Sequence, residues 1–233
     1  MLKIKYAHIH IFVFIVIWFG LFLDGIDKDS QFYTSLIVIM AFIWVYYSTS
    51  KSVKQLMLFG LIIAFGGEVL FSLVFGMYTY RLQNLPVYVP FGHSLVYASV
   101  YYILKEPLVK IHQELIVKIL YFSMIVYSLF WFVFADDTFG FICTLVILAL
   151  FKRHPDTKLF FLFMYFTIVY LELLGTHYGC WYWPEIWFDK VTFISSANPP
   201  SGISVFYFGF DMGCLWLYKH YDKKRWSRLK RLR

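Results

Sequence analysis

Charged residues are scarce in this chain of 233 residues. Asp, Glu, Lys and Arg together make up 15% of it, whereas hydrophobic residues make up 61%. Soluble domains average about 25% charged and about 45–50% apolar residues. The shortage of charge excludes an ordinary soluble domain and predicts an integral membrane protein.

Cysteine is equally rare. Cys143, Cys180 and Cys214 are odd in number and show neither a CxxC pair nor metal-ligand spacing, which argues against a disulfide framework. A signal-peptide cleavage site is also missing. The first hydrophobic run ends at Leu23-Asp24 without a small-x-small motif, so we expect it to remain as a signal anchor.

Long apolar runs are what the chain has instead. Runs of about 20 apolar residues are long enough to cross the hydrocarbon of a bilayer. Eight can be drawn, at 8–24, 32–50, 55–80, 91–104, 115–134, 138–151, 159–183 and 201–218. The fourth and sixth are short, so seven is the alternative. The predicted fold class is all-α, a polytopic membrane helix bundle of about eight transmembrane helices.

Lys and Arg are distributed unevenly among the predicted loops. With the N-terminus inside, only Lys28, Arg81 and Lys190 of the 21 basic residues fall in outer loops. Because basic residues collect in cytoplasmic loops, we expect both termini in the cytoplasm of a multi-pass protein of the plasma (inner) membrane. The basic tail, residues 219–233, is expected to contact anionic headgroups and not nucleic acid.

The most unusual residues occur twice. Glu68 interrupts an apolar run and is followed by Gly76-Met-Tyr78-Thr-Tyr80; Glu172 is followed by Gly179-Cys-Trp181-Tyr-Trp183. A one-residue slip after the glutamates and a longer second loop are the only adjustments needed. The pattern predicts an internal duplication, which sets the architecture. Both glycines are expected to permit close helix contact.

The duplication predicts how the membrane domain, residues 1–233, is organised. Repeat one covers 1–110, repeat two covers 111–218, and the basic tail follows. Four helices per repeat is an even number, so the two copies run in the same direction. They should be related by a pseudo-two-fold axis along the membrane normal, which is the parallel kind of repeat.

Three acidic residues lie within predicted helices: Glu68, Glu172 and Asp211. Such a group costs about 2.5–3.5 kcal/mol near the bilayer centre, so these residues are usually functional. If the third, fourth, seventh and eighth helices surround the axis, the three carboxyls converge on one cavity. Burial and mutual repulsion should keep at least one of them protonated at neutral pH. They are the predicted catalytic acids.

Polar and aromatic residues near these acids are the predicted substrate-binding residues. They are Ser72, Tyr78, His93, Ser94, Tyr97, Thr176, His177, Trp181, Asn198 and Tyr207. Ser72 and Thr176 stand one turn after each glutamate and either orient it or bond back to their own helix. The aromatic rings either pack or stabilise a cation through their π faces. The loop from Pro184 to Pro200 is either an interfacial connection or a lid.

Departures from the repeat indicate a division of labour. Asp211 in the second copy corresponds to Tyr101 in the first, and His93 in the first copy corresponds to Ile203 in the second. We therefore expect Glu172 and Asp211 to be the working pair, with Glu68 and His93 assisting. An HExxH metal pair is absent, and we predict no cofactor. Two histidines with three carboxylates still leave metal binding as an alternative.

This layout resembles the integral-membrane isoprenoid enzymes: the lycopene cyclases, the related carotenoid hydratases and the small fungal membrane terpene cyclases. The resemblance rests on Glu68 with Gly76-Met-Tyr78-Thr-Tyr80 and Pro90, on the second copy at Glu172, and on Asp211 as a late-helix acid. It implies protonation or hydration of an olefin by acidic residues inside the bilayer. The Pro-Glu-Glu type signature of the lycopene cyclases is absent.

Three functions follow as hypotheses. The first is an enzyme that cyclises, hydrates or isomerises a lipid-soluble isoprenoid by general acid and base catalysis. The second is a proton-coupled carrier with the paired glutamates at the repeat interface. The third is a metal-dependent lipid hydrolase or oxidase. In each, the partners are a lipid-soluble small molecule and membrane lipids.

Overall fold

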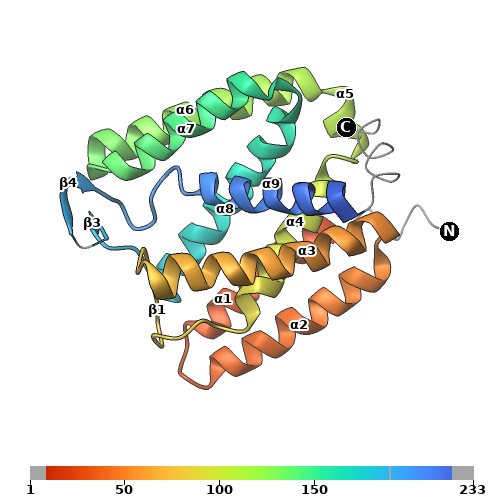
Figure 1. Cartoon of the computed structure of the whole chain (residues 1–233), viewed down its shortest axis with the longest axis horizontal. Coiled ribbons are helices and arrows are strands. Elements are labelled where there is room, and N and C mark those ends of the chain that lie inside the picture. Colours follow the sequence, from red (N-terminus) through yellow and green to blue (C-terminus); the bar gives the residue numbers. More distant parts are fainter. Residues whose placement is uncertain (1–8, 189, 222–233) are drawn as a thin grey trace.

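The chain folds as an all-α protein, as the sequence predicts. The computed structural model describes residues 9–188 and 190–221. Within these residues there are nine α-helices: α1 (Ile9–Asp24), α2 (Ser30–Ser48), α3 (Lys51–Glu68), α4 (Tyr88–Ile103), α5 (Pro107–Ile111), α6 (Gln113–Ala135), α7 (Thr138–Arg153), α8 (Lys158–His177) and α9 (Ser204–Tyr221) (Figure 1). Each of the eight predicted apolar runs overlaps one of the eight longer helices. The short α5 lies between the predicted runs 91–104 and 115–134.

Fewer helices than expected are long and apolar enough to cross a membrane. Among the described residues these are the segments Ser30–Ser48, Lys51–Val74, Gln113–Ala135 and Pro155–His177. Helices α1, α4 and α7 have 16 residues each, or about 24 Å at the α-helical rise, which is short of the roughly 30 Å hydrocarbon core. About eight spanning helices are therefore not supported, and neither is the alternative of seven. The four long helices indicate a membrane protein.

The outer surface fits a lipid environment. Only Met124 and Ser128 of α6 are buried, while Phe122, Phe130 and Phe134 on the same helix are exposed. Soluble monomers rarely expose continuous apolar patches larger than a few hundred Å². An apolar helix with this much exposed surface suits contact with lipid tails.

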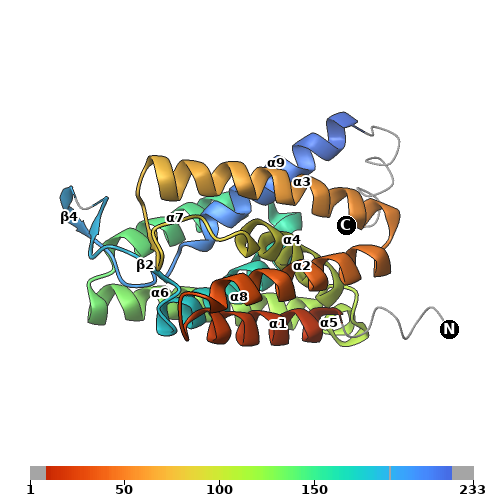
Figure 2. The ribbon, with the colours of Figure 1, turned by 90° about the horizontal axis from the view of Figure 1, so that it is seen from below.

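Helices α3 and α9 contact each other. In Figure 1 they run between α1 and α2 on one side and α6 and α7 on the other, and Figure 2 shows that they lie along one face of the molecule. In both views the α2–α3 turn, α5 and the end of α9 lie at one end of the bundle, and the β-strands lie at the other (Figure 2). The predicted inner and outer loops are thus separated in space.

Several helix contacts recur in the two halves. The α1–α2, α2–α4 and α3–α4 contacts have counterparts in α6–α7, α7–α9 and α8–α9, and α3–α9 has its counterpart in α4–α8. Other contacts lack an equivalent of similar size: α1 packs on both α4 and α8, whereas α6, its counterpart, packs on α8. The division at residue 110 stays a prediction. The predicted headgroup contact of the tail lies largely outside the described residues.

Two glycines end the glutamate-bearing helices. Gly76 and Gly179 have φ values of +62° and +68°, which L-residues with a side chain rarely adopt. A Cβ at either position would meet nothing within 4 Å, so the expectation that they permit close helix contact is wrong. They turn the chain instead. The predicted runs 55–80 and 159–183 accordingly stop being helical at Val74 and His177.

The segments after these glycines pair with each other. Strands β1 (Thr79–Tyr80) and β2 (Trp181–Tyr182) are antiparallel, with Tyr80 opposite Trp181. A second pair, β3 (Ile186–Trp187) and β4 (Val191–Ser195), forms a separate hairpin. The β1–β2 pair joins the matching segments of the two predicted repeats.

Asp137 fixes the connection into α9. Its side chain is completely buried at the start of α7. Oδ1 accepts the backbone N–H groups of Gly140 and Ala197 at 3.1 and 3.0 Å, and Oδ2 accepts that of Ser201 at 2.7 Å. Hydrogen bonds to an ionised group are among the strong ones. They hold the segment that leads into α9 and its Tyr207.

Candidate active site

Both glutamates of the repeated motif line one interior cavity. Its volume is about 80 Å³, and its walls come mainly from α1, α3, α4, α8 and α9 together with the two motif segments. Most of the lining is apolar; it includes Val16, Ile17, Leu21, Val38, Val89, Leu95, Phe71, Phe206 and Phe210. Glu68 and Glu172 are each 3% exposed. The structure therefore places two buried carboxyls around a single apolar space.

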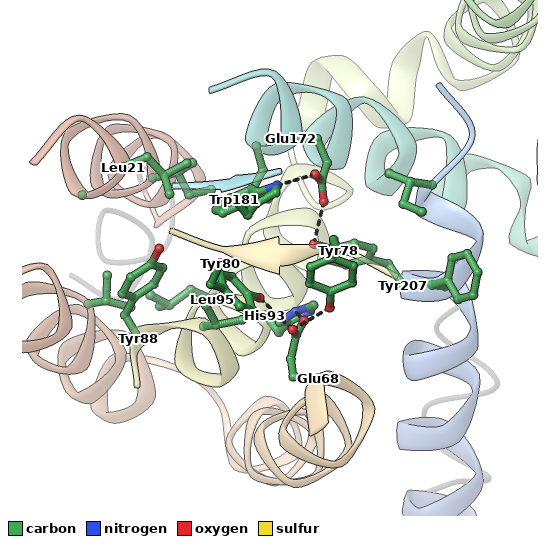
Figure 3. Close-up of a pocket in the computed structure, with 18 of the residues that line it drawn as sticks. Leu21, Glu68, Tyr78, Tyr80, Tyr88, His93, Leu95, Glu172, Trp181 and Tyr207 are labelled. Atoms are coloured by element: carbon green, nitrogen blue, oxygen red, sulfur yellow. Dashed lines mark hydrogen bonds and ion pairs between the residues drawn. The ribbon is translucent and has the colours of Figure 1, made fainter. Parts of the chain in front are cut away.

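Both oxygens of Glu68 are bound. The phenol groups of Tyr78 and Tyr80 donate to Oε2 at 2.6 and 2.7 Å. Nε2 of His93, on α4, lies 2.8 Å from Oε1 (Figure 3). Burial raises the pKa of both Tyr78 and Tyr80 well above the ordinary value of a tyrosine, and the nearby charge of Glu68 raises it further. Both phenols therefore remain donors at any physiological pH.

Glu172 has a different set of partners. The indole N–H groups of Trp181 and Trp183 donate to its Oε2 at 2.8 and 3.1 Å. Oε1 has a longer contact of 3.3 Å with the hydroxyl of Tyr207. One oxygen of Glu172 is thus strongly held, while the other is more available to exchange a proton with a bound molecule.

The donors of the two acids occupy matching positions. In each copy they stand two and four residues after the positive-φ glycine, as Tyr78 and Tyr80 or as Trp181 and Trp183. The one-residue slip between the copies falls in the π-helix η1 (Val69–Val74), which follows Glu68 directly. A π-turn holds one more residue than an α-turn, so η1 absorbs the additional residue and leaves the aromatic pair in reach of the acid.

The four aromatic rings lie between the two carboxyls. The rings of Tyr78 and Trp183 are 4.5 Å apart, and those of Tyr80 and Trp181 are 6.1 Å apart at a steep angle. In Figure 3, β1 crosses the space between Glu172 and Glu68. The aromatic faces therefore form the centre of the site, in reach of both acids.

Asp211 does not join the pair. It lines a second, smaller cavity of about 20 Å³ together with Tyr97, Met164 and Cys214. The predicted convergence of three carboxyls in one cavity is thus reduced to two. Glu172 and Asp211, expected to work as a pair, line different cavities.

The predicted hydroxyl ligands mostly bond to backbone. Oγ1 of Thr176 donates to the carbonyl of Glu172 at 2.8 Å, as a helix residue bonding back to its own turn does. Oγ of Ser72 donates to the carbonyl of Tyr78 at 3.3 Å, and Oγ of Ser94 donates to that of Met57 at 2.8 Å. These three residues shape the backbone around the site and do not line its cavity.

Two further predicted residues stand beside the site. Oδ1 of Asn198 accepts the backbone N–H of Trp183 at 3.0 Å and so supports the second aromatic motif. His177, at the end of α8, packs against the ring of Tyr178 and does not line the cavity. In the loop from Pro184 to Pro200, for which a lid is one of the two predicted roles, the described residues do not line the cavity either. Trp187 of this loop stacks on Phe139 of α7 instead.

A buried polar cluster at the strand end of the bundle was missed. Asp24, which in the sequence only marks the end of the first hydrophobic run, is completely buried. It accepts hydrogen bonds from Arg81 Nη2 at 3.4 Å and from the hydroxyl of Tyr88, a cavity-lining residue, at 3.1 Å. Arg81 also donates to the carbonyl of Asp27 at 2.6 Å. The available signal was Arg81 itself, one of only three basic residues predicted in outer loops, because such a charge calls for an acidic partner on the same side.

The described residues contain no group of three or more His, Cys, Asp or Glu side chains placed to hold a metal ion. The metal-dependent hypothesis therefore has no ligand set in this part of the chain. Comparison with protein-family models, with curated proteins and with solved structures finds no match to this chain. The site's own geometry is thus the basis for a functional conclusion.

Proposed function

We propose that this protein is a membrane-embedded enzyme that uses Glu172 and Glu68 as an acid and base pair on a lipid-soluble, isoprenoid-type olefin. The observation that carries the proposal is the pairing of two buried carboxyls, with different hydrogen-bond partners, around one apolar cavity. An apolar cavity with a few convergent polar groups is the usual form of a small-molecule site.

The hydrogen bonds suggest the role of each acid. Oε1 of Glu172, the less tightly held oxygen, carries the proton that is given to a C=C bond. The positive charge then resides on the substrate carbon, where the faces of Tyr78 and Trp183 and the carboxylate of Glu68 stabilise it. Glu68 removes a proton from the neighbouring carbon, and the C–H electron pair forms the new double bond.

These two proton transfers isomerise the olefin without a cofactor. Attack on the cation by a second double bond would give a ring, and attack by water would give an alcohol, so the three reaction types of the hypothesis share one first step. The cavity of about 80 Å³ accommodates a short segment of a chain. The rest of a longer substrate extends along the apolar α1 and α2 side.

Deuterium incorporation tests the proposal. Purified protein in detergent is incubated with squalene or lycopene in D₂O, and the recovered lipid is analysed by mass spectrometry. Wild type should incorporate deuterium, and Glu172→Gln should lower the rate by about 10² to 10⁴, the usual contribution of a positioned acid. Glu114→Gln, an exposed change on α6, is the matched control and should leave the rate unchanged. Full incorporation by Glu172→Gln would refute the acid role.

A proton-coupled carrier is the second candidate, because several helix contacts recur in the two halves that carry the paired glutamates. Such repeats commonly bind substrate at their interface. Coupled proton and lipid-soluble cation uptake into liposomes, with the lipid chemically unchanged, would favour the carrier over the enzyme.

A further inference from the structure

Two cavities share one wall. The rings of His93, Tyr207 and Phe210 line both the glutamate cavity and the smaller cavity that contains Asp211. His93 and Tyr207 are stacked, with ring centroids 4.7 Å apart and planes 24° apart, and Phe210 closes the edge of His93 at 5.4 Å. The wall is one side chain thick.

Each polar ring of the wall is bonded to one of the two acids. His93 Nε2 contacts Glu68 Oε1 at 2.8 Å, and the Tyr207 hydroxyl contacts Glu172 Oε1 at 3.3 Å. Imidazole can take a proton on one nitrogen and release one from the other, and a phenol hydroxyl both donates and accepts. Both rings therefore have the chemistry of a proton relay between the cavities, with the hydroxyl and the imidazole turning between transfers.

The smaller cavity contains the groups that such a transfer needs. Asp211 is 5% exposed and shares the space with the polar side chains of Tyr97 and Cys214. Its volume of about 20 Å³ is enough for one water molecule, for which about 10–15 Å³ is required. A buried carboxyl beside a water-sized polar space, one ring away from the site, is an arrangement for storing and passing protons.

We propose that Asp211 is a positioning and proton-return residue that resets the glutamate pair through His93 and Tyr207 after each reaction; this rests on the proposed function. After an isomerisation Glu68 holds the proton taken from the substrate and Glu172 has lost its own. Glu68 gives its proton to His93 Nε2, and His93 passes its other N–H proton through the small cavity to Asp211. Rotation of the imidazole ring then lets the Nε2 proton exchange for one at Nδ1 through the cavity water, which restores the starting tautomer. Asp211 gives a proton to the Tyr207 oxygen, and Tyr207 gives its hydroxyl proton to Glu172. The path leaves the number of protons on the protein unchanged, and the water of the small cavity exchanges with solvent, so in D₂O the proton that returns to Glu172 is a deuteron.

Infrared spectroscopy of the carboxyl groups tests this path without a substrate. The C=O band of protonated carboxyls is followed after a rapid change from H₂O to D₂O, and the band is assigned by its loss in Glu68→Gln or Glu172→Gln. In Asp211→Asn the exchange of that band should slow by roughly 100-fold, the lower end of the effect of a positioned proton-transfer group. Circular dichroism confirms that the variant is folded.

A second variant blocks the path without removing a charge. Gly60 lines the small cavity, and a Cβ there would lie 3.3 Å from Ser94 Oγ and 3.8 Å from Cys214 Sγ, so Gly60→Ala fills the space. It should slow exchange in the same direction. Gly66→Ala on the same helix is the matched control, because its Cβ would meet nothing within 4 Å. If Asp211→Asn does not fold, the exchange rate of Gly60→Ala alone decides whether protons pass through the small cavity.

The outcomes separate this path from the proposed function. Exchange at the wild-type rate in Asp211→Asn or Gly60→Ala overturns the path, and so does the lack of any C=O band that the glutamate variants remove. Slow exchange in both variants, combined with full deuterium incorporation by Glu172→Gln, would leave the path standing while refuting Glu172 as the acid on the substrate.

Discussion

The chemical nature of the donors distinguishes the two acids. Indole N–H groups only donate, so Trp181 and Trp183 fix Glu172 Oε2 as an acceptor. Phenols donate and accept, so Tyr78 and Tyr80 can follow a change in the charge of Glu68. The same backbone motif thus holds Glu172 rigidly by one oxygen, whereas the partners of Glu68 can adjust to its charge.

Removing a phenol hydroxyl from Glu68 should be measurable as lost stability. Tyr80→Phe keeps the ring but deletes a 2.7 Å hydrogen bond to a buried carboxyl, which should lower the free energy of unfolding by about 1.5–3 kcal/mol, as for hydrogen bonds to charged groups. Tyr182→Phe, an exposed position in β2, is the control and should change stability by less than about 0.5 kcal/mol. Denaturant titration in detergent measures both. Equal stability of the two variants would show that Glu68 does not depend on this donor.

At the scale of single elements, the π-helix explains how the repeat tolerates unequal spacing. Glu68 and Gly76 are eight residues apart, and Glu172 and Gly179 are seven. The backbone N–H of Phe75 bonds to the carbonyl of Leu70, which is an i→i−5 bond, so the additional residue is contained within η1. The residues beyond it keep their direction relative to the acid.

Deleting one residue within η1 should therefore be tolerated. Without Leu73, which is 55% exposed, the segment can form ordinary α-helix and keep Tyr78 and Tyr80 on Glu68. Deletion of Ile62, also exposed and on the same continuous helix, should instead rotate everything beyond it by about 100° and disrupt the fold. Thermal unfolding compares the two. If both deletions are equally disruptive, η1 is not an insertion that the helix can lose.

The elements also show which features the sequence could predict. Hydrophobic length located all eight long helices, and the unusual placement of Glu68 and Glu172 in apolar runs identified the pair that lines the cavity. Pattern alone did not show that Gly76 and Gly179 adopt positive φ, because a small residue suits both packing and turning. The β1–β2 pair is two residues per strand, too short for a periodic signal.

Burial of loop residues was the least predictable feature. Asp24 and Asp137 are completely buried although each stands at a helix end, where acids are usually solvated. Their burial depends on partners distant in the sequence: Arg81 and Tyr88 for the first, Ala197 and Ser201 for the second. Asp211 was placed in the wrong cavity for a related reason, since helical periodicity gives a face but not the depth along the bundle.

For the whole molecule, charge and shape agree on an orientation. Lys51 starts α3, Lys110 lies in α5 and Lys158 starts α8, and these turns share one end of the bundle. Lys28 and Arg81 belong to the opposite end, where the strands and the Asp24 cluster lie. Because basic residues are retained on the cytoplasmic side, the end without strands should face the cytoplasm.

Cysteine labelling in cells measures this orientation directly. Lys28 and Lys51 are both exposed and lie at opposite ends, whereas the native cysteines Cys143, Cys180 and Cys214 are buried and should give little background. In Lys28→Cys, a membrane-impermeant maleimide should label intact spheroplasts, because that end faces outward. Lys51→Cys should be labelled only after permeabilisation, since the reagent cannot reach the cytoplasmic end. The reverse labelling pattern would show that the protein has the opposite orientation. Labelling of both variants in intact spheroplasts would show that the membrane does not separate the two positions. If the strand end faces outward, Tyr88, which is bonded to Asp24 beneath Arg81, borders the glutamate cavity on its outer side. The cavity that contains Asp211 then has to exchange protons with solvent through the protein interior.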